Sequence, residues 1–291
     1  MPEMKSHAPG SFCWAEVGTV NTKKTKAFYS ELFGWKYEDK PAEFGVYTMC
    51  KTGGKDLAGL YEMPADLLKM GVPPHWMSYV AVANADAACE KIKKHGGVVQ
   101  QGPFDVMEVG RMAICKDPTG ATFSIWQAKA HQGASVMGES GTPCWFELAT
   151  RGVTKAEKFY KDVFGWNVKA STAAGMEYRE IHAAGSPMPQ GGMMELTPQH
   201  GPIPPHWLIY FTVQDCDTDA KRCQTLGGKV VVPPMDIPNV GRFAVLADPA
   251  GATFAIIKLS FDPTKHSASD KPAAATAKAT TTPSKASSKK K

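Results

Sequence analysis

The strongest constraint on the fold is that the chain repeats itself once. Three pairs of matching segments lie 131 residues apart: CWAEVGTVNTKKTKAFYSELFGW (13–35) and CWFELATRGVTKAEKFYKDVFGW (144–166), PPHW (73–76 and 204–207), and DPTGATF (117–123) and DPAGATF (248–254). A period of this length is that of a domain with its own core, whereas solenoid units are much shorter. The sequence therefore predicts two homologous domains, at 11–128 and 142–259, joined by a polar linker over 129–141.

Composition places the chain among ordinary globular proteins. Of its 291 residues 43% are apolar and 21% charged, which argues against a fibrous or wholly disordered chain. No apolar run approaches the roughly 18 residues of a membrane-spanning helix, and the first residues lack the apolar segment of a secretory signal. The seven cysteines form no CxxC pair, which favours free thiols in a reducing compartment. We therefore expect a cytoplasmic protein with no membrane partner.

The net charge of +5 comes entirely from the C-terminal segment. Residues 261–291 contain seven lysines and two aspartates, so the rest of the chain is neutral. A neutral body argues against a fold whose own surface binds nucleic acid. The segment is rich in Ala, Ser, Thr and Pro, which predicts a disordered tail. Nucleic acid is therefore expected as a partner only through this tail, and the alternative is a solubilising end.

Within each repeat the pattern strand, helix, strand, strand, strand occurs twice. Alternating apolar residues, Gly/Pro breaks and helical periodicity define these elements. In the first repeat the expected strands are 12–19, 35–38, 44–51, 55–62, 75–83, 98–100, 109–116 and 121–127, with helices beginning near residues 22 and 86. The chain is thus predicted to be α+β, with four βαβββ units.

Three motifs give this pattern a family resemblance. They are FYxxxFGW (28–35 and 159–166), Gly-Gly after the second helix of each repeat, and GRxAxxxDPxGATF (110–123 and 241–254). With them the chain resembles the vicinal oxygen chelate superfamily of glyoxalases, bleomycin-resistance proteins and extradiol dioxygenases, in particular its tandem glyoxalase-like branch. The resemblance implies paired βαβββ modules that form an incomplete barrel around a small-molecule cavity. It also implies a monomer or a homodimer.

In metal-dependent members of this superfamily, His and Glu side chains of the barrel strands hold a divalent cation. The matching positions of the first domain are Trp14, Met77 and Ser124, and none of them supplies an imidazole or a carboxylate. Trp145, Leu208 and Ala255 stand at the same positions of the second domain. Tryptophan offers only an N–H donor. The resemblance therefore predicts that both domains lack the family's metal site.

A displaced metal site is the alternative. Strand residues two apart share a face, so Glu16 lies on the side of Trp14 and His75 on the side of Met77, with Glu62 as a third candidate. The second domain offers the equivalent set of Glu147, Glu195 and His206. One imidazole with two carboxylates could hold Zn, Ni, Mn or Fe. We favour the interpretation that these histidines cap a strand and that the glutamates accept hydrogen bonds from amides or indoles.

Further candidates for ligand contacts are aromatic or basic. The aromatic residues expected to line the cavities are Trp14, Tyr47, Trp145 and Tyr178. Arg111 and Arg242 either grip an anionic substrate or pair with Asp117 and Asp248, and we favour the pairing slightly. No nucleophile–base pair is evident, so no catalytic residue is assigned.

The sequence supports three functional hypotheses. We favour a protein that binds a small organic molecule in aromatic cavities, with no strong metal centre. The first alternative is a metal-dependent lyase or isomerase of the lactoylglutathione lyase type, or an oxygenase, that uses the displaced Glu/His site. The second is an interaction protein tethered by its basic tail.

Overall fold

The computed structural model describes residues 3–42, 45–171, 177–184, 186 and 188–260. The predicted disordered tail, 261–291, lies outside the described residues. Among the residues that the structure does describe, no helix has the length and apolar character that a membrane crossing requires.

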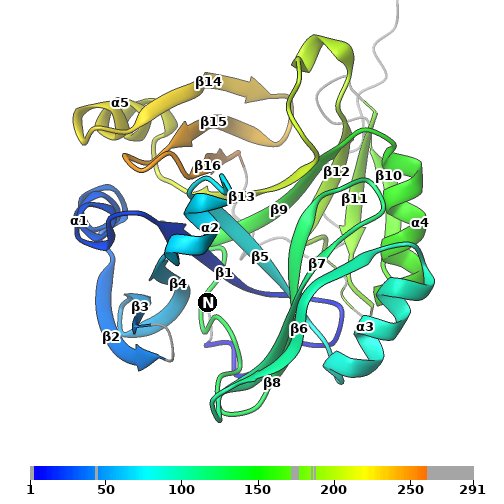
Figure 1. The fold of residues 1–291 in the computed structure, drawn as a ribbon. Coiled ribbons are helices and arrows are strands. Elements are labelled where there is room, and N and C mark those ends of the chain that lie inside the picture. The colour runs from blue at the N-terminus through cyan, green and yellow to red at the C-terminus, as the bar shows by residue number, and fades with distance from the viewer. Residues whose placement is uncertain (1–2, 43–44, 172–176, 185, 187, 261–291) are drawn as a thin grey trace, which may run out of the picture.

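Each half of the chain forms one eight-stranded sheet with helices on one face (Figure 1). The first half contains β1 (Phe12–Thr19), α1 (Thr22–Phe33), β2 (Lys36–Ala42), β3 (Gly45–Thr52), β4 (Lys55–Glu62), α2 (Ala65–Lys69), β5 (His75–Ala81), α3 (Ala85–Lys94), β6 (Val98–Val106), β7 (Gly110–Lys116) and β8 (Thr122–Ala128). The second half contains β9 (Pro143–Thr150), α4 (Val153–Phe164), β10 (Asn167–Ser171), β11 (Tyr178–His182), β12 (Gly191–Glu195), η2 (Pro198–His200), β13 (His206–Thr212), α5 (Cys216–Thr225), β14 (Lys229–Ile237), β15 (Gly241–Ala247) and β16 (Thr253–Leu259).

The strand order confirms the predicted α+β fold of paired βαβββ modules. In the first sheet the order is β2-β3-β4-β1-β5-β8-β7-β6, and the second sheet repeats it as β10-β11-β12-β9-β13-β16-β15-β14. Within a module the first and last strands are parallel, as β1 is to β4 and β5 to β8. The two modules join through the antiparallel pair β1 and β5. Each sheet curls, and we call the side turned away from its helices the inner face.

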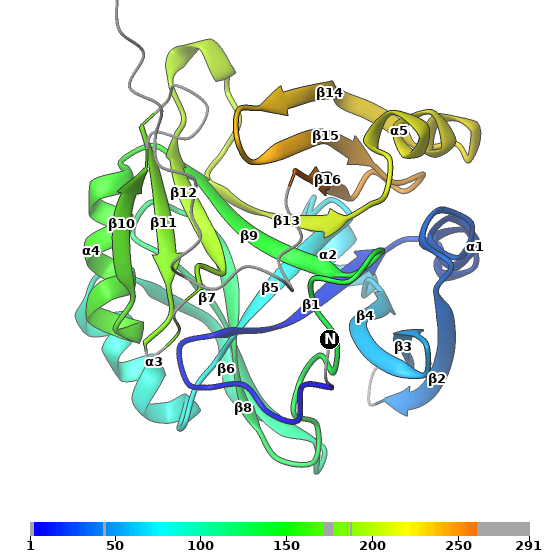
Figure 2. The same ribbon diagram turned by 180° about the vertical axis from the view of Figure 1, so that it is seen from behind.

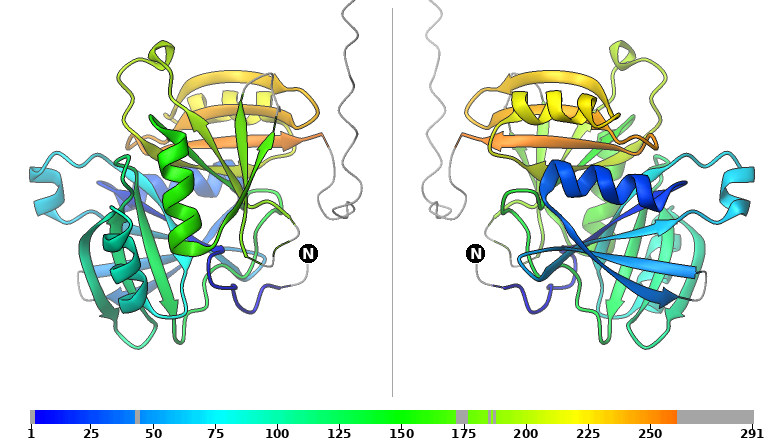
Figure 3. Two further views of the ribbon diagram at one scale, coloured as in Figure 1. Left: turned by 90° about the vertical axis from the view of Figure 1, so that its right-hand side faces the viewer. Right: turned by 90° about the vertical axis from the view of Figure 1, so that its left-hand side faces the viewer.

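The two domains share one hydrophobic core between their helix-covered faces. The right-hand view of Figure 3 shows α1 lying beside α5, and the left-hand view shows α3 beside α4. The tyrosines of the FYxxxFGW motif cross this boundary: Tyr29 donates to Asp248 at 3.3 Å and Tyr160 donates to Asp117 at 3.0 Å. Since both contacts are buried, the duplicated motif holds the domains together as well as packing helix on sheet.

The motif's tryptophans make the same kind of reciprocal contact. The indole of Trp35 donates to the carbonyl of Gly141 at 2.7 Å, and that of Trp166 donates to Gly10 at 2.6 Å. Both tryptophans are fully or almost fully buried. A buried indole needs a hydrogen-bond acceptor, and here the chain segment that precedes the other domain provides it.

The segment between the domains packs against the first domain and is not a plain polar linker. Ala134 and Val136 are 1% and 3% exposed. The amide of Ala134 donates to the carbonyl of Cys13 and that of Ser135 to Asp56, each at 2.8 Å. The N-terminal segment runs beside it, because Met4 donates its amide to Ser135 (Figure 2). The linker therefore covers part of the first sheet's inner face.

Candidate functional site

The inner face of the first domain carries a hydrogen-bonded chain of four side chains. The indole of Trp14 donates to the hydroxyl oxygen of Tyr47 at 2.9 Å. Tyr47 in turn donates to Oε2 of Glu16 at 2.8 Å. Tyr79 donates to the other carboxylate oxygen, Oε1, at 2.9 Å. We call this set the tyrosine–glutamate network.

The second domain contains the same network at positions 131 residues further along. Trp145 donates to Tyr178 at 2.9 Å, and Tyr178 donates to Oε2 of Glu147 at 2.8 Å. Tyr210 donates to Oε1 of Glu147 at 2.9 Å. Donors, acceptors and distances thus agree between the two domains.

Local sequence explains how the network is assembled. Trp14 and Glu16 are two residues apart on β1 and therefore share its inner face. Gly59 pairs with Glu16 across the sheet, and a Cβ at that glycine would lie 1.9 Å from the Tyr47 hydroxyl oxygen. Gly192 plays the same part for Tyr178, at 2.2 Å. A side chain at either glycine would displace the tyrosine from the carboxylate.

Burial dominates the electrostatics of the network. Glu147 is 9% exposed and Glu16 is half-buried. Desolvation raises the pKa of both carboxyls, and the tyrosine hydrogen bonds partly oppose this rise. Burial and the neighbouring carboxylate raise the pKa of Tyr47 and Tyr79 well above the ordinary value. Both hydroxyls therefore stay protonated and act as donors to the carboxylate.

The walls around the two networks differ. In the first domain they consist of two thioethers, an indole and an aliphatic side chain: Met77, Met112, Trp126 and Ile114. In the second domain the equivalent positions hold Leu208, Phe243, Ile257 and Val245. Both surfaces are apolar, and each surrounds one polar group.

One end of the first network is covered by the linker. The imidazole of His131 packs edge-on against Trp14, with ring centroids 4.6 Å apart, and Trp126 donates its indole N–H to the His131 carbonyl at 2.9 Å. Trp14 is accordingly 4% exposed, whereas Trp145 is partly exposed. Burial lowers the pKa of His131. Among the described residues, only the first network has such a cover at its tryptophan.

The displaced metal sites predicted as an alternative are not assembled. Glu62 is exposed. Glu195 caps the start of α4, because its carboxylate accepts hydrogen bonds from the backbone amides of Gly152 and Val153 at 2.8 Å each. His75 bonds the carbonyl of Pro73 at 2.8 Å and His206 bonds that of Pro204 at 2.9 Å. Across the described ranges, no group of three or more His, Cys, Asp or Glu side chains is placed to hold a metal ion.

The family's own ligand positions do not fit a divalent cation either. In the first domain the indole N–H of Trp14 already donates a hydrogen bond to Tyr47. The other two positions offer the thioether of Met77 and the neutral hydroxyl of Ser124. In the second domain the three positions are an indole, Leu208 and Ala255. Divalent ions of this chemistry need carboxylate, imidazole or thiolate donors. The side chains present do not match that requirement.

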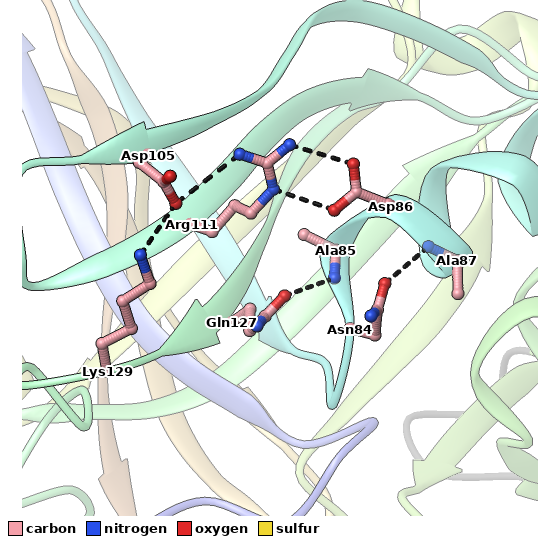
Figure 4. Close-up of polar contacts among 8 residues, drawn as sticks. All are labelled: Asn84, Ala85, Asp86, Ala87, Asp105, Arg111, Gln127 and Lys129. Carbon is pink, nitrogen blue, oxygen red and sulfur yellow. Dashed lines mark hydrogen bonds and ion pairs between the residues drawn. The ribbon is translucent and has the colours of Figure 1, made fainter.

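The expected pairing of the two arginines with Asp117 and Asp248 is wrong, and the structure places both arginines on the helix side of their sheets. Figure 4 shows Arg111 on the helix side of its sheet, where it binds both carboxylate oxygens of Asp86 at 2.9 Å and approaches Asp105 at 3.5 Å. The arginine holds the pKa of Asp86 below its usual range. Asp117 instead accepts backbone amides of its own turn and the Tyr160 hydroxyl. Arg111 therefore neither lines the inner face nor pairs with Asp117.

Arg242 repeats this arrangement in the second domain. It binds both oxygens of Asp217, at 2.6 and 2.9 Å, and one oxygen of Asp236 at 3.1 Å. Asp248, its predicted partner, is bound by Tyr29 and by amides of its own turn. Each arginine thus ties the start of a helix to a strand hairpin.

The sequence missed Tyr79, Tyr210 and His131. The two tyrosines could have been found, because each lies two residues after a predicted inner-face position, Met77 or Leu208. His131 lies in a polar segment without periodicity, so no local signal pointed to it. The predicted aromatic residues Trp14, Tyr47, Trp145 and Tyr178 do come together with the glutamates.

A family model matches both halves of the chain. The model for the glyoxalase/bleomycin resistance protein/dioxygenase superfamily matches residues 13–125 and 144–256. The two matches coincide with the two curled sheets.

Curated relatives match nearly the whole chain. The protein named "Putative glyoxylase CFP32" of Mycobacterium tuberculosis is 40% identical over 261 residues, which are 89% of this chain and 98% of the relative. "Anthracycline biosynthesis protein DnrV" of Streptomyces peucetius is 34% identical over 269 residues, 88% of this chain and 96% of the relative.

Solved structures share the fold at low sequence identity. A Mn(II)-bound glyoxalase from Novosphingobium aromaticivorans superposes with a TM-score of 0.59 at 15% identity, covering 86% of this chain and 82% of its own. The 2,3-dioxygenase LapB from Pseudomonas sp. KL28 gives a TM-score of 0.59 at 12% identity, covering 87% and 93%.

Proposed function

Since the chain belongs to the glyoxalase/bleomycin resistance protein/dioxygenase superfamily, we propose that it binds a small organic molecule on the inner face of its domains without a metal centre. The tyrosine–glutamate network is the polar anchor, and the apolar walls receive the body of the ligand. Ligand pockets in proteins are commonly built this way, with an apolar lining and a few oriented polar groups.

One observation carries this proposal: the network is identical in both domains while its surroundings have diverged. A buried carboxylate with two tyrosine donors is costly to maintain unless it serves a purpose. Helix packing and domain contacts do not need it, because those lie on the opposite face of each sheet. A binding role explains why the same four side chains stand on both inner faces.

The ligand's body is expected to be aromatic. Methionine and aromatic side chains on the first wall, and Phe243 with Trp145 on the second, favour flat ring systems. One relative is named for the biosynthesis of anthracyclines, a class of molecules that contain fused aromatic rings, and that name agrees with such a ligand.

The alternatives receive less support. A metal-dependent lyase or oxygenase would need the displaced Glu/His sets, and in each domain the members of those sets have other partners or point to solvent. An interaction role through residues 261–291 concerns a segment outside the described residues.

Calorimetric titration with 2-naphthylmethanol, a neutral aromatic alcohol, tests the proposal. We expect saturable binding that is lost when Tyr47 and Tyr178 are both replaced by alanine. The control is the double variant Arg111→Ala/Arg242→Ala, which alters the helix side and should bind normally. If the arginine variant lost binding of the alcohol and the tyrosine variant retained it, the ligand would bind elsewhere and the proposal would be refuted.

A further inference from the structure

We propose that the group bound by each network is a cation, so that the ligand is an aromatic molecule bearing an amine or amidine beside its ring. This inference rests on the proposed function and adds the chemical class of the ligand. It follows from the direction of the hydrogen bonds, the charge balance of the inner face and the aromatic surfaces around the carboxylate.

The hydrogen bonds of the network leave only acceptors for a ligand. The indole proton of Trp14 is donated to Tyr47, and the hydroxyl protons of Tyr47 and Tyr79 are donated to Glu16. What remains is the lone pairs of the carboxylate and of the Tyr79 oxygen. The second domain has the same directions. A ligand must therefore supply the hydrogen-bond donors.

The carboxylates also lack a cationic partner among the described residues. The ion pairs of the described chain involve neither Glu16 nor Glu147, and the charge of His206 has only a minor effect on Glu147. The two arginines of the motif are held on the helix side by aspartates. A buried carboxylate without a counter-charge is unfavourable, and a bound cation would correct this imbalance.

The surrounding rings suit a cation as well. Tyrosine and tryptophan faces attract ammonium groups through their π electrons, most strongly where water is excluded. Tyr79 and Trp14 are both 4% exposed, and Tyr210 is 5% exposed. An anionic ligand would meet a carboxylate of the same sign with no donor to compensate, and the site should reject it.

Three probes that share a naphthalene ring test this inference on the full chain. They are 2-naphthylmethylamine (a cation at neutral pH), 2-naphthylmethanol and 2-naphthoic acid (an anion), each titrated by calorimetry. We expect the amine to bind at least about tenfold more tightly than the acid, which corresponds to about 1.4 kcal/mol.

The variant Glu16→Gln/Glu147→Gln should retain the alcohol and lose the preference for the amine. Glu62→Gln, which removes an exposed carboxylate instead, is the matched control and should behave as the native chain. If the acid bound to the native protein as tightly as the amine or more tightly, the inference would be overturned and the proposed function would stand. The same conclusion would follow if the glutamine variant still preferred the amine. Absence of saturable binding by all three probes would contradict the proposed function itself.

Discussion

The inner faces of the two domains agree in their polar centre and differ in the apolar side chains that surround it. The same Trp–Tyr–Glu–Tyr hydrogen bonds recur at the same distances. At equivalent positions around them, the first domain has Trp126, Ser124 and Met112 and the second has Ile257, Ala255 and Phe243. Within the described residues, the linker covers the tryptophan end of the first network, and the second network has no such cover. Under the proposed function, both sites would bind the same functional group and accept ligand bodies of different shape.

The largest difference between the domains is expected at the paired tryptophans. Trp14→Ala should lower the free energy of unfolding by about 3–5 kcal/mol, because it empties a buried site between the sheet and the linker. Trp145→Ala, at a partly exposed position, should cost about 1–2 kcal/mol. Urea denaturation of both variants measures this, and equal losses would mean that the linker adds nothing to the first site.

Removal of the covering ring should have the next largest effect. His131→Ala should destabilise the protein by about 1–3 kcal/mol, since it removes the imidazole packed on Trp14. It should also shift tryptophan emission to longer wavelength as water reaches Trp14. The exposed neighbour Gln132 is the control, and Gln132→Ala should leave emission unchanged. An unchanged spectrum in the histidine variant would show that the ring does not seal this end.

The stability that the linker and the N-terminal segment add to the first domain should depend on pH. Burial lowers the pKa of His131 and of His7, whose ring nitrogen Nε2 lies 2.9 Å from the carbonyl of Ala134; the unfolded chain therefore takes up protons at a higher pH than the folded chain. The stability that the neutral rings contribute is present above pH 6.5, the ordinary value, and decreases as the pH falls below it.

Urea midpoints at pH 7.5 and 5.5 measure this dependence in the native chain and in His7→Gln/His131→Gln. The variant should lose less stability between the two pH values than the native chain does. Asp56 also acts on His131 and favours its protonated form, so Asp56→Asn should steepen the native dependence. Parallel pH profiles for the native chain and the double variant would contradict the assignment.

The smallest effect is expected at Ser124. Its hydroxyl is fully buried and, among the described residues, has no hydrogen-bond partner, whereas the second domain has Ala255 there. Ser124→Ala should raise the free energy of unfolding by about 1 kcal/mol or less, and Ala255→Ser should lower it. Destabilisation by Ser124→Ala, measured in the same urea series, would reveal a partner for the hydroxyl.

The duplication made most of the fold predictable. Matches at one constant spacing, together with strand and helix periodicity, predict two domains and the βαβββ order. Residue alternation also placed Glu16 beside Trp14 on one strand face. These properties depend on local geometry, which the sequence records directly.

Contacts between distant segments were not predictable in the same way. Arg111 has a carboxylate near it in sequence, Asp117, but binds Asp86 because α3 packs across the strand that carries the arginine. Tyr29 belongs to the FYxxxFGW motif, and nothing in that motif indicates that its hydroxyl donates to Asp248 of the other domain. The linker covers the first network through His131, which contacts Trp14 only because the linker folds back over the sheet. Such choices follow from tertiary packing, which no spacing rule encodes.

The most direct test of the central claim compares ligand binding with and without metal. The native chain, exhaustively treated with chelator, is titrated calorimetrically with 2-naphthylmethylamine, and the titration is repeated after incubation with zinc, nickel, manganese or iron(II). The network account predicts the same dissociation constant in every case, because Glu16, Glu147 and their tyrosines bind the probe directly. Binding that disappears on chelation and returns with one divalent ion would contradict it.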